Sequence, residues 1–156
     1  MRTLGGIIEM SPIESKPAAY VLRLNVFFSS QLTGKAFVSI QNPVRLDKYS
    51  EPQPDVSILK MQEDFYASHH PLPQNAFLVI EVCDTTFNID HDIKLPLYAQ
   101  AGVPEVWLAD VNKKRILRFM NPTDDAYASR EEFSSKDRIA PGAFPDVALD
   151  LSWFFK

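Results

Sequence analysis

The segment Ala76–Cys83 (AFLVIEVC) limits the possible folds more than any other part of the chain. Its residues are apolar on both alternating faces except at Glu81, which is the pattern of a strand covered on both sides. Such strands belong to sheets that carry helices on both faces. The sequence therefore predicts an α/β domain in which both faces of this strand are covered.

A helix and another strand follow this segment. Residues 88–101 have a helical pattern with Asp90 as a candidate N-cap, and Pro96 predicts a kink or a restart within it. Val106–Asp110 then has the composition of a strand. We therefore predict that 76–110 forms a right-handed parallel β-α-β crossover.

The other segments complete a central mixed sheet flanked by helices. Residues 16–32 predict a helix after an N-cap at Ser15, because their apolar side chains recur at the spacing of one helical face. Arg115–Met120 should pair with the preceding strand in an antiparallel hairpin. Further strands are predicted at 36–40, 44–46 and 54–59, a loop at 62–74, and a polar connection from 121 that leads into an apolar run at 144–155.

The length and the charge of the chain set limits on its class. A chain of 156 residues is about one domain long, so we expect a single domain over 1–156. Sixteen Lys and Arg against 20 Asp and Glu give a net charge of −4, so a polyanion would have to be held locally. No Lys or Arg lies between Met61 and Ile93, a window with six carboxylates and all three histidines. We expect any chemistry to lie there.

Cys83 is the only cysteine, which excludes an internal disulfide and a Cys/His zinc cluster. A reducing, cytoplasmic setting is the expected default. The N-terminus lacks the apolar core of a signal peptide, and no apolar run is long enough to span a bilayer. We therefore expect no membrane partner, and we expect no small organic cofactor.

Two carboxylates are the first candidates for chemistry. Glu81 lies in an otherwise apolar strand, so it should be protonated, ion-paired or bound to a metal. Asp55 begins the predicted strand 54–59, and both acids can meet at one sheet edge if the two strands pair. A hard divalent cation such as Mg²⁺ would relieve their repulsion. The alternatives are a Glu81 that reaches solvent or one basic partner, and an Asp55 that serves only the turn after Pro54.

Phosphoryl chemistry also needs a cation that orients water and offsets developing charge. Position 83, two residues beyond Glu81 on the same strand face, holds a cysteine and cannot supply it. Lys94 is the first basic residue after the acidic window, and on a helix it shares a face with Asp90 and Tyr98. Lys94 can thus reach the acids from the side, or it can be a surface lysine paired with Asp90.

Long stretches of the chain match a known pattern. The segments EPQPDVSIL (51–59) and FLVIEVCDTTFNIDHDIKLPLYAQAGVPEVWLAD (77–110), with EMSP (9–12) upstream, resemble a bacterial family of restriction-endonuclease-like domains. That family belongs to the PD-(D/E)XK nuclease superfamily, and the resemblance covers nearly the whole chain. It implies a restriction-endonuclease-like fold and hydrolysis of phosphodiester bonds in DNA with Mg²⁺ or Mn²⁺.

The resemblance also implies roles for individual residues. Pro54-Asp55 matches the superfamily's Pro-Asp motif, and Glu81 matches its second acid. The superfamily's strand lysine, which in this family has migrated to the following helix, falls on Lys94. Asp55 and Glu81 would then hold the metal, with the Val82 carbonyl as an additional ligand, and Lys94 would position the attacking water. Glu9 is either a further acid of the site or a surface residue.

Contacts to DNA would come from basic side chains that follow the phosphates. The first candidates are Lys16, Arg23, Lys113, Lys114 and Arg115, and the further ones are Lys35, Arg45, Lys48 and Arg118. The alternative is that these residues are only a solvated face. No helix-turn-helix or zinc finger is visible, and a homodimer would bring two sites to one duplex.

Two functions remain open. The first is a metal-dependent DNA endonuclease, which the presence of Asp55, Glu81 and Lys94 favours. The second is a catalytically silent module on the same fold that binds nucleic acid or another protein. The acidic total favours this alternative, as does Pro17, which stands where family members often carry a histidine.

Overall fold

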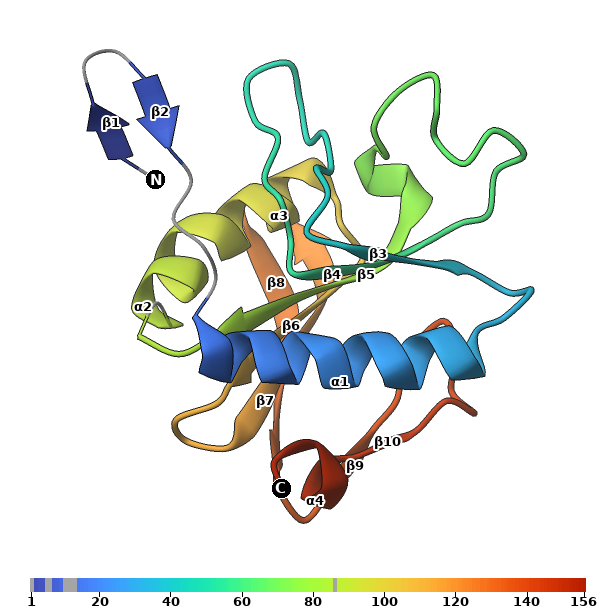
Figure 1. The fold of residues 1–156 in the computed structure, drawn as a ribbon, viewed down its shortest axis with the longest axis vertical. Coiled ribbons are helices and arrows are strands. Elements are labelled where there is room, and N and C mark those ends of the chain that lie inside the picture. Colours follow the sequence, from blue (N-terminus) through green and yellow to red (C-terminus); the bar gives the residue numbers. More distant parts are fainter. Residues whose placement is uncertain (1, 5–6, 10–13, 86) are drawn as a thin grey trace.

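The computed structural model describes residues 2–4, 7–9, 14–85 and 87–156, with side chains from residue 14 onward (Figure 1). At its centre is a six-stranded sheet in the order β3-β4-β5-β6-β7-β8. The strands are β3 (Phe37–Ile40), β4 (Val56–Leu59), β5 (Ala76–Cys83), β6 (Glu105–Asp110), β7 (Arg115–Thr123) and β8 (Ala126–Ser134). Only β5 and β6 pair in parallel, and the other neighbours are antiparallel. The predicted mixed sheet with one parallel crossover is confirmed.

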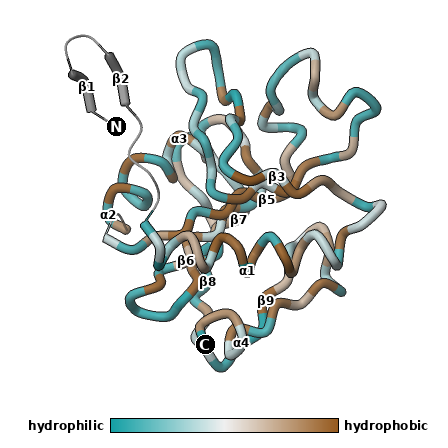
Figure 2. Tube along the Cα trace, in the orientation of Figure 1, coloured by the Kyte–Doolittle hydropathy of each residue, from teal (hydrophilic) through white to brown (hydrophobic). Residues whose placement is uncertain are grey.

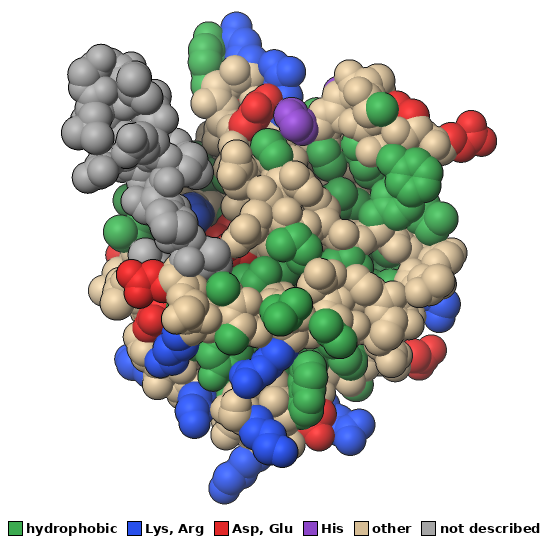
Figure 3. All heavy atoms as spheres, viewed as in Figure 1, with side chains coloured by type: hydrophobic (Ala, Val, Ile, Leu, Met, Phe, Trp, Pro, Cys, Tyr) green, Lys and Arg blue, Asp and Glu red, His purple; other side chains and the backbone are tan. Residues whose placement is uncertain are grey.

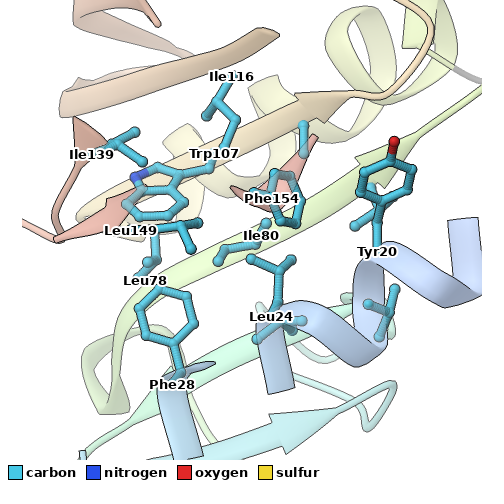
Figure 4. Packing of buried hydrophobic residues seen from close by; sticks show 14 of the residues in the cluster. Tyr20, Leu24, Phe28, Leu78, Ile80, Trp107, Ile116, Ile139, Leu149 and Phe154 are labelled. Carbon is cyan, nitrogen blue, oxygen red and sulfur yellow. The ribbon is translucent and has the colours of Figure 1, made fainter. Parts of the chain in front are cut away.

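Helix α1 (Ser15–Gln31) covers one face of this sheet. Its buried side chains Tyr20, Leu24 and Phe28 face the strands, where they meet Ile80 of β5 and Trp107 of β6 (Figure 4). In Figure 2 the hydrophobic positions concentrate along the strands and recur along α1, as the helical spacing predicts. This core fixes β5 from the α1 side.

The opposite face of β5 packs against a second cluster. Val79 and Cys83 of β5 contact this cluster together with Leu95 and Tyr98 of the helix that follows the strand. Because strand side chains alternate, Glu81 points to the same face as Val79 and Cys83. The covering of β5 on both faces, expected from its sequence, is therefore present.

The segment that connects β5 to β6 is one helical stretch with an irregular middle. It comprises α2 (Phe87–Ile89), the π-helical turn η2 (Asp90–Lys94) and α3 (Leu95–Ala101). The N–H of Leu95 bonds to the carbonyl of Asp90, five residues back. Pro96 lies in the first turn of α3, where its missing donor is tolerated. The predicted helix with an interruption near Pro96 is confirmed, but Asp90 lies inside the π turn and is not an N-cap.

Three local predictions were wrong. Ser15 is the first residue of α1, and Glu14 is its N-cap without a side-chain hydrogen bond. Residues 44–46 form no strand, because the N–H of Leu46 donates to the carbonyl of Ser50, four residues further on, in a short loop flanked by prolines. The expected polar connection after residue 121 contains β8, which extends the sheet by pairing with β7.

Smaller elements complete the described chain. They are the antiparallel pair β1 (Arg2–Leu4) and β2 (Ile7–Glu9), the 3₁₀ turn η1 (Pro73–Asn75), the antiparallel pair β9 (Arg138–Ile139) and β10 (Leu149–Asp150), and α4 (Leu151–Phe154). The side chain of Glu9, named above as a possible acid, lies outside the described side chains. Among the described residues, no helix is long and apolar enough to cross a membrane.

Candidate active site

Asp55 lies immediately before β4 and is fixed to the end of β5. Its Oδ2 accepts a hydrogen bond of 2.8 Å from the backbone N–H of Val82. Val56 pairs with Ile80, so the residue before Val56 lies level with the residue after Ile80, which is Glu81. Burial raises the pKa of Asp55, against the lowering effect of the Val82 hydrogen bond. The pairing of β4 with β5 thus brings the two acids to one edge of the sheet.

Glu81 is a buried carboxylate with two side-chain partners. Only 2% of the residue is exposed. The hydroxyl of Tyr98 donates to Oε1 over 2.8 Å, and Nζ of Lys94 lies 3.4 Å from Oε2. Burial raises the pKa of Glu81 to about 8; Lys94 opposes this shift, whereas the nearby carboxylates of Asp55 and Asp90 add to it. This group therefore exchanges its proton near neutral pH.

Lys94 lies on the helical segment and contacts two carboxylates. Its Nζ lies 3.1 Å from Oδ1 of Asp90 and 3.4 Å from Oε2 of Glu81. Burial alone would lower the pKa of Lys94, but these two carboxylates outweigh it and raise the pKa above its ordinary value. The amine therefore stays protonated at neutral pH. It contacts Glu81 from the side, as the position of Lys94 on the helix predicts.

Asp90 is a member of this cluster whose burial the sequence did not indicate. The residue is 3% exposed, and it stands in the π turn one helical turn before Lys94. The spacing of four residues from Lys94 was the available signal, but it predicted a surface charge pair as readily as a buried one. Single π turns inside α-helices occur frequently at functional sites. Asp90 thus joins Asp55 and Glu81 as a third acid of the site.

These side chains line one pocket of about 400 Å³. Among the described residues, five carboxylates line it and Lys94 is the one basic side chain. The acids are Glu14, Asp55, Glu81, Asp84 and Asp90. Such an excess of negative charge, in a pocket of hard oxygen ligands, suits a divalent cation.

The number of protein side chains that could ligate a metal in this pocket indicates which cation the pocket suits. In the described part of the chain, no group of three or more His, Cys, Asp or Glu is arranged to hold a metal by itself. Mg²⁺ usually keeps several waters and uses one or two protein carboxylates with substrate phosphate oxygens. The pair of Asp55 and Glu81 therefore suits Mg²⁺, whose remaining ligands would be waters and phosphate oxygens of the substrate.

The histidines lie outside this pocket. His69 and His70 are exposed in the loop before η1, as expected. His91 contacts Asp92 at 3.0 Å and packs against Phe119, and it lines a different pocket. Pro17, at the position where the sequence resemblance implies a histidine, lines the candidate site.

Cys83 is a buried residue beside the acids of the site, with its thiol next to Asp90. The residue is fully buried, burial raises the pKa of its thiol, and its Sγ contacts the carbonyl of Glu81 at 3.6 Å. It therefore behaves as a small core residue at the position where a lysine would stand beside Glu81. The cation of the site comes from the helix.

The basic candidates divide into two groups. Lys16 donates to Asn112 over 3.1 Å, and Asn112 donates to the carbonyl of Asp84 at the pocket. Lys16 thus lies close to the pocket, and Lys113 and Lys114, which follow Asn112 in the β6–β7 turn, are exposed. Figure 3 shows Lys and Arg side chains gathered over the lower part of the viewed face.

The arginines of the candidate set have partners within the molecule. Arg23 donates to the carbonyl of Phe154 over 2.9 Å and lies over the ring of Tyr20. Arg115 pairs with Asp110 and Glu132. Both guanidinium groups therefore stabilise the fold, and the lysines are the better candidates for contacts to a ligand.

The amino-acid sequence matches a known protein family. Residues 3–152 match the sequence profile of the family Uma2, described as "Putative restriction endonuclease". The chain belongs to this family. The Uma2 assignment agrees with the resemblance found in the segments around Asp55, Glu81 and Lys94.

A solved structure has the same fold as this Uma2 chain. The crystal structure of a putative nuclease from Anabaena variabilis superposes with a TM-score of 0.76 and 15% sequence identity. The match covers 97% of this chain and 87% of that one. The restriction-endonuclease-like fold is thereby confirmed. A comparison with curated proteins finds no match.

Proposed function

We propose that this protein is a metal-dependent nuclease that hydrolyses phosphodiester bonds in DNA, with Mg²⁺ or Mn²⁺ as its cation. The observation that carries the proposal is the convergence of Asp55, Glu81 and Lys94 on one acidic pocket. Membership of a family described as restriction endonucleases and a nuclease fold support it. Asp55 and Glu81 would hold the cation, and the Val82 carbonyl stays a candidate ligand.

The bound cation would supply a Lewis acid for the phosphate and lower the pKa of a water molecule. The protein side chains prepare the site for it. The Val82 N–H holds the Asp55 carboxylate in place, and the Tyr98 hydroxyl does the same for Glu81. Both acids therefore present fixed oxygens, so little reorganisation is needed when a ligand arrives.

Lys94 acts as a donor in this proposal. Its amine is protonated at neutral pH, because Asp90 and Glu81 raise its pKa, so it cannot take a proton from water. Its N–H groups can instead orient the attacking water and offset the negative charge that grows on the phosphate. This is the positioning role that the family resemblance implies for the migrated lysine.

The phosphates that flank the cleaved bond would meet the lysines near the pocket. Lys16 is held there by Asn112, next to Lys113 and Lys114. Arg23 and Arg115 complete the set of candidate DNA contacts, but each would have to exchange internal partners for phosphates. Binding that rests on these cations should weaken steeply with salt.

A nicking assay tests the proposal. Supercoiled plasmid is incubated with Mg²⁺ or Mn²⁺ and with the wild type, Asp55→Asn, Glu81→Gln or Lys94→Met, and exposed Asp146→Asn is the matched control. We expect each of the three site variants to lose at least roughly 100-fold in rate, and the control to equal the wild type. Equal nicking by all five proteins would overturn the site assignment.

The alternative is a catalytically silent module on the same fold. Pro17 at the pocket favours it, because no described histidine lines that pocket. In that case no protein of the series nicks DNA with either metal, while the wild type still binds DNA or another protein. A metal titration of wild type and Asp55→Asn then shows whether the pocket retains its cation.

A further inference from the structure

The helical segment that carries Asp90 and Lys94 exposes three aliphatic side chains next to the pocket. Ile89, Ile93 and Leu97 are 54%, 59% and 40% exposed. They follow one another at intervals of four residues, so they lie along one side of the segment. Ile89 also lines the pocket, so this aliphatic stripe begins at the pocket itself.

The stripe offers no free cation to a phosphate. Lys94 is the only Lys or Arg between residues 87 and 101, and its amine is directed to Asp90 and Glu81. Among the described residues, Lys16 of α1 is a basic side chain close to another part of the pocket. Lys16 reaches it through Asn112, whose amide bonds to the carbonyl of Asp84. In Figure 1 the helical segment lies above the end of β5, whereas the start of α1 and the β6–β7 turn lie below it.

The pocket therefore has one aliphatic border and one basic border. An intact duplex keeps its base faces stacked within, so an aliphatic stripe beside it meets sugar, phosphate and the base edges in the grooves, but no base face unless a step is opened. A strand with unstacked bases has phosphates on one side and apolar base faces on the other. Ile and Leu side chains next to DNA are used in this way, as wedges and walls against unstacked bases.

We propose that the scissile nucleotides are unstacked when bound, with their bases against Ile89, Ile93 and Leu97 and their phosphates toward Lys16, Lys113 and Lys114. The substrate class is then a single strand, a flap or a mismatched bubble, and a perfect duplex is a poor substrate. This inference rests on the proposed nuclease function, because it assigns the substrate of the same pocket. The continuity of the stripe with the pocket favours nucleic acid over a second copy of the chain as its occupant.

The test compares labelled oligonucleotides of one sequence as a single strand, as a bubble and as a perfect duplex, with Mn²⁺. The variants are Ile93→Gln and Leu97→Gln, and the matched controls are Leu22→Gln and Val26→Gln, which change exposed aliphatic residues of α1. We expect the wild type and both controls to cleave the single strand and the bubble at least ten-fold faster than the duplex. The stripe variants should lose most of this preference, and circular dichroism checks that they are folded.

Two further readouts separate the possible failures. Fluorescence anisotropy with Ca²⁺ in place of Mn²⁺ measures the same preference as binding, so the inference is decided even if nothing is cleaved. Hydrolysis of bis(p-nitrophenyl) phosphate by the wild type tests the proposed function alone, because this diester has no bases. Equal rates and affinities for single strand and duplex would overturn the inference while leaving the nuclease intact. A dimer that Ile93→Gln converts to monomer, with an unchanged substrate preference, would assign the stripe to a second copy instead.

Discussion

Tyr98 donates its hydroxyl hydrogen bond to Glu81 over 2.8 Å, although the two residues are 17 positions apart in the chain. Tyr98 comes from α3 and Glu81 from β5, and both are buried. The bond therefore ties the helix that carries Lys94 to the strand that carries the central acid. A neighbouring group that donates to a candidate metal ligand in this way fixes the direction in which the carboxylate points.

Removal of this hydroxyl gives the first prediction. Tyr98→Phe should cost about 1–2 kcal/mol of unfolding free energy, because one carboxylate oxygen loses its donor. Mn²⁺ affinity should fall about ten-fold. Tyr127→Phe is the control, since Tyr127 donates to the Val103 carbonyl over 2.7 Å and does not line the pocket. Urea unfolding and metal titration measure both effects, and an equal Mn²⁺ affinity in the two variants would contradict the role of Tyr98.

Lys94 gives the second prediction. Lys94→Met leaves Glu81 and Asp90 without their shared cation, yet the side chain is 37% exposed, so solvent screens part of the loss. We expect about 1–2 kcal/mol of destabilisation near neutral pH. Lys94→Arg should keep most of the stability but little of the nicking activity, because a planar guanidinium cannot place its donors as an ammonium does. Full activity of Lys94→Arg in the nicking assay would show that charge alone suffices.

The raised pKa of Glu81 predicts a pH dependence of stability in the metal-free protein. A carboxyl with a higher pKa in the folded state contributes stability that is complete below its ordinary pKa of 4.5 and is lost as the pH rises toward about 8. We expect a decline on the order of 5 kcal/mol across this window in EDTA. Glu81→Gln should flatten the decline, whereas the exposed Glu63→Gln should not. Urea titrations at several pH values measure it, and parallel curves for wild type and Glu81→Gln would contradict the shift.

A second buried glutamate predicts an effect on stability alone. Glu105 accepts hydrogen bonds from the indole N–H of Trp107 over 2.6 Å and from the N–H of Gly142 over 2.8 Å. Glu105→Ala should cost about 3 kcal/mol, because it leaves buried donors without partners. Mn²⁺ affinity should stay that of the wild type, since Glu105 does not line the pocket. A large loss of metal binding would link this network to the site.

Gly142→Ala probes the same network without removing a polar group. A methyl group at this position would lie 2.7 Å from Cε of Met120 and 3.2 Å from Oε1 of Glu105. The flexible end of Met120 can move aside, whereas the Glu105 carboxylate is held by Trp107. We therefore expect a modest cost of about 1 kcal/mol in thermal or urea unfolding. A cost above that of Glu105→Ala would mean that the backbone at residue 142 cannot move.

The parts of the fold that could be predicted are those with a local pattern. The two-faced apolar run Ala76–Cys83 and the helical spacing of α1 both reflect burial directly, so β5 and α1 were found within one or two residues. Strand β8 was missed because an edge strand with exposed faces needs little apolar sequence. It forms through backbone pairing with β7, which its own composition does not indicate.

Part of the site could also be predicted, because three of its residues stand out from their local sequence. Asp55 and Glu81 stood out as carboxylates in or before apolar strands, and Lys94 stood out as the first basic residue after an acidic window. The burial of Asp90 depends on a π turn, and a spacing of four residues does not distinguish a π turn from an α turn. The assignment of one domain over 1–156 and the roles of the site residues stay predictions.

The charge of the pocket sets an order of events for the proposed nuclease. With five acidic side chains against one lysine along its wall, the metal-free pocket offers the phosphodiester that it would cleave no net attraction, even with Glu81 protonated. We therefore expect the cation to enter the pocket before or together with the phosphate to be cleaved. Metal supply would then govern whether the protein engages nucleic acid at all, and EDTA would release a bound strand rather than trap it uncleaved.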